Sequence, residues 1–233
     1  MVDSPVGSPT VSSLVVAIDG PSGSGKSSTS RGVAARLGLR YLDTGAMFRA
    51  MTWWMLSHDV DLGDPDAIAA RAGEPLIESG TDPLDPTITV DGQDASVAIR
   101  SDEVNAAVSP VSAVPAVRAR LLDLQREIIA AGEGIVVEGR DIGSVVAPDA
   151  PVKLYLSADP EARAMRRAAE AGGDVAATQE SLLARDRIDS GRATAPLTMA
   201  DRAVHIDTTP YTLDEVISQV VALVEATVHE ADA

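Results

Sequence analysis

A glycine-rich loop directly after a short apolar run is the feature that most constrains how this chain can fold. Residues 14–18 read Leu-Val-Val-Ala-Ile, and residues 20–27 complete a G-x-x-x-x-G-K-S pattern. Glycines allow several backbone N–H groups to converge on a polyphosphate. The helix that we expect from here to about Leu37 would direct the positive end of its dipole at the anion. The chain should therefore contain a strand, a phosphate-binding loop and a helix in succession.

The residues of this loop predict a nucleotide-binding site. Lys26 would reach the β- and γ-phosphates, and Ser27 would place its hydroxyl on Mg²⁺ bound to ATP. The alternative is an ordinary turn rich in glycine and serine, which is weakened because Lys26 is one of only two lysines. The predicted nucleotide-binding residues of the loop are Gly20, Pro21, Ser22, Gly23, Ser24, Gly25, Lys26, Ser27 and Ser28.

Composition limits the class of protein. The 233 residues are 45% hydrophobic but only 3% aromatic, so the core must be aliphatic, and the absence of cysteine excludes disulfides and thiolate metal sites. The net charge of −16 argues against a nucleic-acid partner, which needs a basic face. Residues 1–12 are typical of a flexible tail, and no run is long enough to span a membrane. We expect a cytoplasmic monomer.

Five short apolar runs predict buried strands, and helical patterns separate them. The runs cover residues 14–18, 41–43, 135–137, 152–156 and 204–206. This alternation is typical of an α/β protein with a five-stranded parallel sheet flanked by helices, in which ligands bind at the carboxyl ends of the strands. The phosphate loop, residues 43–45 and residues 138–141 each follow a strand, so we expect all three to open onto one crevice.

The long segment from about residue 44 to 134 is too large for one crossover and must contain an insert. Within it, residues 87–90 run into Asp91-Gly92, which predicts a type I′ hairpin and a small β excursion between about residues 75 and 100. Residues 115–131 have apolar side chains at helical spacing, with Gly132 closing the helix.

Several charged residues follow these strands, each with a plainer alternative. Arg49, one helical turn beyond Gly45, could face the crevice or be a solvated helix arginine. Glu138 could order the waters of Mg²⁺ and Asp141 could bind ligand, or both could cap the following segment. If residues 185–192 are helical, Arg185, Asp189 and Arg192 share one face, either as ligand-binding residues or as an exposed salt-bridge ladder.

Taken together, the motifs resemble those of the bacterial cytidylate kinases, small P-loop kinases that phosphorylate CMP and dCMP with ATP. The resemblance spans about residues 14–215 and is specific because the motifs occur in order. They are residues 18–27, Leu42-Asp43-Thr44-Gly45-Ala46-Met47, Gly139-Arg140-Asp141-Ile142-Gly143, Ala147-Pro148-Asp149-Ala150, Arg185-Asp186 with Asp189 and Arg192, and Ala195-Pro196-Leu197.

The resemblance implies an adenylate-kinase-like fold over residues 13–233, with a nucleoside-monophosphate-binding insert at about 47–105 and a short lid at about 163–180. It also implies roles for individual residues. Thr44, Arg118, Asp141 and Arg192 would surround the cytosine, Arg185 and Asp189 would hold the ribose, and Arg49 and Arg140 would bind the CMP phosphate. Lys26, Arg140 and Arg185 would be catalytic, and Arg166 and Arg167 would reach ATP from the lid.

The predicted reaction transfers the γ-phosphoryl group of ATP to CMP or dCMP. A P-loop kinase for another small acceptor, such as UMP, AMP or an alcohol, is the main alternative. A GTPase-type switch is disfavoured because the only asparagine, Asn105, is followed by alanine, which excludes an Asn-Lys-x-Asp guanine motif. A phosphate-binding scaffold without catalysis is the remaining alternative.

Overall fold

The computed structural model describes residues 14–171 and 173–231. The predicted tail, residues 1–12, lies outside the described residues. Five parallel strands form the central sheet, in the order β2-β6-β1-β7-β8. They are β1 (Val15–Asp19), β2 (Arg40–Asp43), β6 (Ile135–Gly139), β7 (Val152–Ser157) and β8 (Val204–Asp207). Each predicted apolar run is therefore a strand, and the predicted parallel α/β sheet is confirmed.

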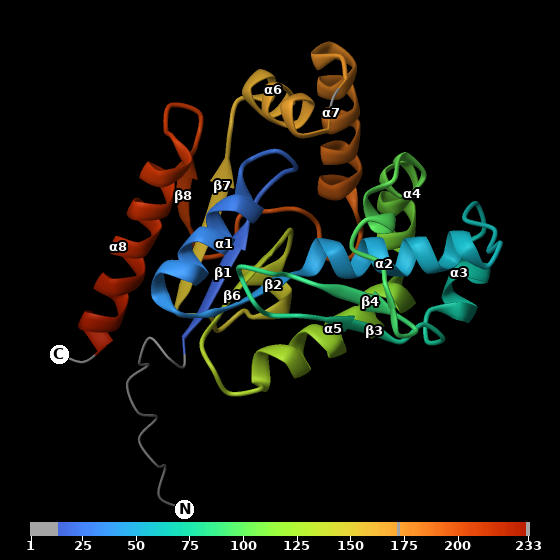
Figure 1. The fold of residues 1–233 in the computed structure, drawn as a ribbon, viewed down its shortest axis with the longest axis horizontal. Coiled ribbons are helices and arrows are strands. Elements are labelled where there is room, and N and C mark those ends of the chain that lie inside the picture. Colours follow the sequence, from blue (N-terminus) through green and yellow to red (C-terminus); the bar gives the residue numbers. More distant parts are fainter. Residues whose placement is uncertain (1–13, 172, 232–233) are drawn as a thin grey trace, which may run out of the picture.

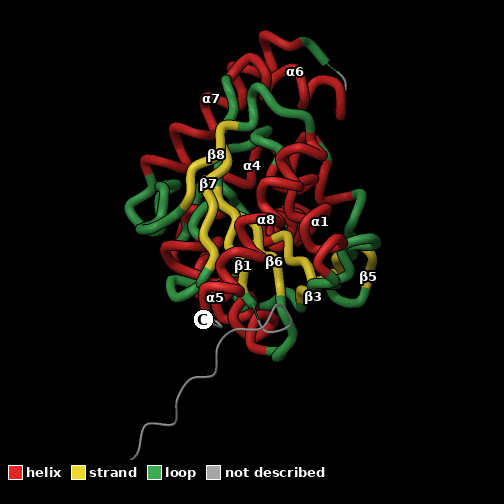
Figure 2. Tube along the Cα trace, turned by 90° about the vertical axis from the view of Figure 1, so that its left-hand side faces the viewer, coloured by secondary structure: helices red, strands yellow, loops and turns green. Residues whose placement is uncertain are grey.

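Two apolar layers cover the sheet. On one face, α1 (Lys26–Leu37) and α8 (Leu213–Ala231) pack on β-strand residues such as Ile18 and Leu156. On the other face, α2 (Thr44–Ser57) and α5 (Pro115–Ala130) pack on residues such as Ala17 and Val137. Alternate residues of one strand thus face opposite layers, because side-chain direction reverses at each step along a strand. Figure 2 shows α1 and α8 in front of the strands.

The insert between β2 and β6 extends to one side of the sheet (Figure 1). After α2 it contains α3 (Pro65–Arg71), the strands β3 (Ile77–Ser79), β4 (Ile88–Val90) and β5 (Gln93–Asp94), a 3₁₀ turn (Ala98–Arg100) and α4 (Asp102–Ala113). The two strands β4 and β5 are antiparallel and joined by Asp91 and Gly92, with φ angles of 51° and 77°. Positive φ at both turn residues is the type I′ geometry expected for Asp-Gly.

Helices α6 (Pro160–Ala171) and α7 (Val175–Gly191) pair with each other and lie above the phosphate loop in Figure 1. They follow β7 and cover the region where we expected the lid. Among the described residues, the helices are all too short or too polar to cross a membrane.

Candidate active site

The phosphate loop connects β1 to α1, as its sequence predicts. Three glycines in it have positive φ angles, namely Gly20 at 149°, Gly23 at 78° and Gly25 at 85°. A Cβ atom on Gly20 would lie 2.0 Å from the carbonyl oxygen of Leu156 in the neighbouring strand. Only glycine fits this close approach, so the turn requires the residue type found there.

Lys26 is buried at the first position of α1, and its Nζ donates a hydrogen bond to the carbonyl oxygen of Pro21 at 2.8 Å. Burial and the charge of Arg140 lower the pKa of Lys26, while Glu138 and Asp19 oppose that shift. A buried ammonium group whose hydrogen bond goes to a neutral carbonyl gains strongly from a nearby polyphosphate. The lysine is thus placed to bind an anion.

Glu138, at the end of β6, joins the phosphate loop to the second strand. Its Oε2 accepts a hydrogen bond from the Ser27 hydroxyl at 3.0 Å, and its Oε1 accepts one from the Tyr41 hydroxyl. Burial and the neighbouring Asp43 raise the pKa of Glu138. Thr44 donates to the Glu138 carbonyl oxygen at 2.7 Å. The carboxylate therefore lies beside the hydroxyl that we predicted to bind Mg²⁺, and the capping alternative for Glu138 is wrong.

Asp141 does not cap the turn that follows it, because its side chain makes no capping hydrogen bond. It forms a buried ion pair with Arg118 instead, with 2.5 Å between Asp141 Oδ2 and Arg118 Nη2. The carboxylate of Asp19 takes over the capping role, because it accepts hydrogen bonds from the backbone N–H groups of Ile142 and Gly143, both at 2.8 Å. Asp141 therefore lines the crevice as part of its ion pair with Arg118.

Arg140 contacts both helix α7 and the phosphate loop. Its Nε lies 2.9 Å from Asp189 Oδ2, and its Nη1 donates to the Gly20 carbonyl oxygen at 3.0 Å. Arg140 thereby ties helix α7 to the phosphate loop. Because Asp189 is only 5% exposed, the exposed-ladder interpretation of this helix is wrong.

The shared helical face that we expected for residues 185, 189 and 192 holds only for the first two. Helix α7 ends at Gly191, and Arg192 is in extended conformation. Its side chain still turns back, with Nε donating to the Asp189 carbonyl oxygen at 3.2 Å and Nη1 lying 3.9 Å from Asp189 Oδ1. A turn at the helix end, rather than a helical face, therefore brings Arg192 to Asp189.

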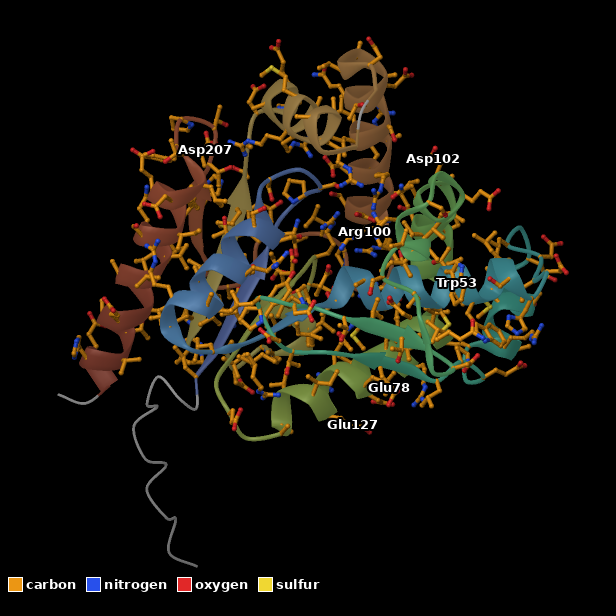
Figure 3. The ribbon with its side chains drawn as sticks, viewed as in Figure 1. Trp53, Glu78, Arg100, Asp102, Glu127 and Asp207 are labelled. Carbon is orange, nitrogen blue, oxygen red and sulfur yellow. The ribbon has the colours of Figure 1, made fainter. Side chains whose placement is uncertain are left out.

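Most of the predicted residues line one cavity of about 460 Å³. Arg118, which spacing alone could not place, lies among them, and Arg49 lines the cavity rather than being solvated. The predicted residues that line it are Ser22, Gly23, Gly25, Lys26, Ser27, Ser28, Thr44, Arg49, Arg118, Arg140, Asp141, Arg167, Arg185, Asp189 and Arg192. Arg100, which is labelled in Figure 3, also lines this cavity.

Four predicted residues do not line this cavity, namely Gly20, Pro21, Ser24 and Arg166. The first three form the back of the loop. Arg166 donates to the hydroxyl and the carbonyl oxygen of Thr208, at 2.9 and 2.8 Å. In this structure the side chain of Arg166 therefore binds the segment after β8 and does not line the crevice.

Sequence reasoning missed Asp19 and Ser109 at the site, and it placed Arg163 only at the start of the expected lid. Asp19 stands within the first motif, and its position at the carboxyl end of β1 was the signal that could have identified it. Buried Ser109 lines the cavity from α4, where nothing in the pattern marks it. Arg163 binds the Ser22 carbonyl oxygen at 3.0 Å and Asp186 at 2.6 Å, joining α6 and α7 to the phosphate loop.

Comparison with solved structures shows the same fold in a distant protein. An uncharacterised protein from Eubacterium ventriosum matches with a TM-score of 0.52 at 10% identity, covering 91% of this chain and 98% of its own. At this identity the likeness concerns the fold alone.

Sequence comparison is more specific. A cytidylate kinase of Streptomyces griseus is 62% identical over 92% of this chain and 94% of its own length. Cytidylate kinases of Rhodococcus opacus and Mycobacterium leprae are 52% and 47% identical, over 92% and 91% of this chain and 96% of their own lengths. The family model for cytidylate kinase matches residues 16–226, which include the phosphate loop and every residue that lines the cavity. On this match, and on the relatives that share half or more of its residues, the chain belongs to the cytidylate kinase family.

Proposed function

We propose that this protein transfers the γ-phosphoryl group of ATP to CMP or dCMP, giving ADP and CDP or dCDP. The observation that carries the proposal is that a phosphate loop and arginines from several other segments line one cavity. One end of this cavity suits a polyphosphate, and the other offers arginines and carboxylates to a smaller charged nucleotide. Membership of the cytidylate kinase family specifies the acceptor.

ATP binds over the phosphate loop in this proposal. Backbone N–H groups of the loop and the start of α1 hold its phosphates, and Lys26 reaches the β- and γ-phosphates. Arg167 reaches ATP from α6, where it lines the cavity. A role for Arg166 at ATP requires that it exchange its hydrogen bonds to Thr208 for new ones when the nucleotide binds.

CMP binds at the other end of the cavity. Arg49 and Arg140 hold its phosphate, and Arg185 and Asp189 hold its ribose. Around the cytosine, the proposed residues are Thr44, Arg118, Asp141 and Arg192. The Thr44 hydroxyl donates to a backbone carbonyl, so its oxygen lone pairs can accept a hydrogen bond from a base amino group.

The oxygen groups beside the loop fit a divalent cation. The Ser27 hydroxyl and the Glu138 carboxylate lie within hydrogen-bond distance of each other, and Mg²⁺ prefers oxygen ligands and retains several waters. Ser27 would hold Mg²⁺ on ATP, and Glu138 would accept hydrogen bonds from its waters. When bound, the ion neutralises charge on the transferred phosphate.

Catalysis then depends on position and charge. An oxygen of the CMP phosphate attacks the γ-phosphorus in line, and the bond from that phosphorus to the bridging oxygen of ADP breaks. The attacking oxygen is already ionised, so no general base is needed. Lys26, Arg140 and Arg185 stabilise the charge on the transferred group.

Initial rates of ADP formation test the proposal. ATP and Mg²⁺ are supplied with CMP, dCMP, UMP, AMP, GMP or no acceptor. We expect strong preference for CMP and dCMP. Equal rates with UMP or AMP would support kinase activity but would contradict the assignment of the base-binding residues. ATP hydrolysis without any acceptor would contradict the proposed acceptor site. Size-exclusion chromatography of the same preparation tests the expected monomer.

A further inference from the structure

Arg49 differs from Arg118 and Arg140 in the kind of group that holds it. Those two arginines each form an ion pair with an aspartate. The guanidinium of Arg49 donates through Nη1 to Asn105 Oδ1 at 2.5 Å and to the Ile99 carbonyl oxygen at 3.4 Å. Both acceptors are uncharged. In the part of the chain that the structure describes, no carboxylate forms an ion pair with Arg49.

The amide of Asn105 is oriented without ambiguity. A guanidinium can only donate hydrogen bonds, so Arg49 must face the amide oxygen. The amide nitrogen donates to the Arg100 carbonyl oxygen at 3.1 Å, which accounts for the other side of the group. Asn105 lies in the first turns of α4, and Arg100, labelled in Figure 3, ends the preceding 3₁₀ turn. One amide therefore ties Arg49 of α2 to the backbone of the 3₁₀ turn that precedes α4.

The charges around Arg49 are mainly positive. Burial and the cations Arg185 and Arg167 lower the pKa of Arg49, with Arg100 adding to them and Asp43 opposing. Such surroundings favour an anion. An aspartate in contact with Arg49 would supply that charge permanently, and a phosphate would have to displace it.

We propose that Asn105 is a positioning residue, which orients the guanidinium of Arg49 for the CMP phosphate without neutralising its charge. The inference rests on the proposed function, in which Arg49 binds that phosphate. A neutral amide supplies the geometry of a hydrogen bond and leaves the full cation for the substrate. Because Asn105 lies on α4 and Arg49 on α2, the packing of these two helices also sets the direction in which Arg49 points before CMP arrives.

Two substitutions separate geometry from charge. Asn105→Ala removes the hydrogen bond that orients Arg49 and should raise KM for CMP about 3- to 10-fold, because the guanidinium keeps its charge and loses only its fixed direction. Asn105→Asp keeps the shape but adds a competing carboxylate, so KM for CMP should rise further, at least about tenfold above wild type. For both variants, KM for ATP should stay within about twofold.

Two controls separate positioning from a structural effect. Cytidine lacks the phosphate, so its inhibition constant should be the same in wild type and in the Asn105→Asp variant. In an Arg49→Ala background, Asn105→Asp should produce no further rise in KM, because the proposed target of the carboxylate is gone. Urea unfolding of each variant shows whether it folds. If Asn105→Asp does not fold, the Asn105→Ala variant combined with Arg49→Ala decides the question.

The outcomes are distinct from those of the proposed function. If wild type does not prefer CMP, the proposed function fails first. If wild type prefers CMP but Asn105→Asp binds it normally, or if Asn105→Ala is as damaging as Asn105→Asp, the proposal for Asn105 is wrong. Parallel weakening of cytidine and CMP would also overturn it, because that result indicates general damage to the pocket.

Discussion

Removing either partner of the Arg118–Asp141 ion pair should destabilise the protein more than any exposed ion pair could. The Nη2 and Oδ2 atoms are 2.5 Å apart, and the two side chains are only 9% and 7% exposed. Removing one partner leaves the other charge buried and unpaired, at a cost of about 3–5 kcal/mol. Arg118 also lies over the ring of Phe48, 5.2 Å from its centroid, and donates to the Ser112 carbonyl oxygen. We therefore expect Arg118→Met to lie at the upper end of that range.

Urea unfolding, followed by circular dichroism at neutral pH, measures these free energies. The double variant Arg118→Met/Asp141→Leu removes both charges of the pair and leaves neither one unpaired, so it should be no less stable than either single variant. Arg36→Met is the matched control, because its partner Asp214 and Arg36 itself are 80% and 43% exposed. Loss of that pair should cost no more than about 1 kcal/mol.

Rates of CMP phosphorylation by the same variants show whether a loss of stability and a loss of function have separate causes. Both residues belong to the proposed cytosine site, so the double variant should recover stability without recovering the rate with CMP. If the two single losses add to within about 0.5 kcal/mol, the residues do not act as a pair and the reasoning is refuted. Recovery of CMP phosphorylation by the double variant would instead remove the pair from the binding site.

Three further predictions concern other parts of the molecule. Lys26→Ala should lower the rate of ADP formation by about 10²-fold or more, since it removes a preorganised charge at the phosphates, and a rate within tenfold of wild type would contradict its role. Arg192→Ala should raise KM for CMP selectively; an equal loss with AMP and UMP would show that Arg192 does not act in base or ribose recognition. Glu215 accepts hydrogen bonds from the Thr212 backbone N–H and hydroxyl, both at 2.8 Å, and these lower its pKa. A lowered folded-state pKa stabilises above the unfolded value and is lost as pH falls, so the stability difference between wild type and Glu215→Ala should shrink between pH 7 and about pH 3 in urea titrations. A constant difference would show that the carboxylate charge does not matter.

The elements that the sequence predicted well are those with local causes. The strands β1, β2 and β6 alternate between the two apolar layers, whereas β7 buries alternate residues on one face and β8 buries only Ile206. The glycines of the phosphate loop and the Asp91-Gly92 turn need positive φ angles that few other residues tolerate, so their conformations were readable from residue type. The ordered motifs also identified the family without any knowledge of contacts.

Contacts between distant segments could not be read in this way. Arg192 lies beyond the end of α7, where the helical spacing fails, and a local turn restores its contact with Asp189. From the sequence, Asp141 and Glu138 could also have capped the segment that follows them. The structure excludes this, because Arg118 binds Asp141 and because Ser27 and Tyr41 donate hydrogen bonds to Glu138. The spacing of residues along the chain does not predict such contacts between distant segments.

The sequence by itself determined the five strands of the central sheet, the phosphate loop and the family, because these follow from backbone preferences and from residues close together in the chain. Only the tertiary structure decided which acceptor holds each arginine. Arg49 meets Asn105, 56 residues away, and Arg140 meets Asp189, 49 residues away. A guanidinium takes its partner from whatever the packing of separate elements brings within 3 Å or so, and that packing depends on the whole fold.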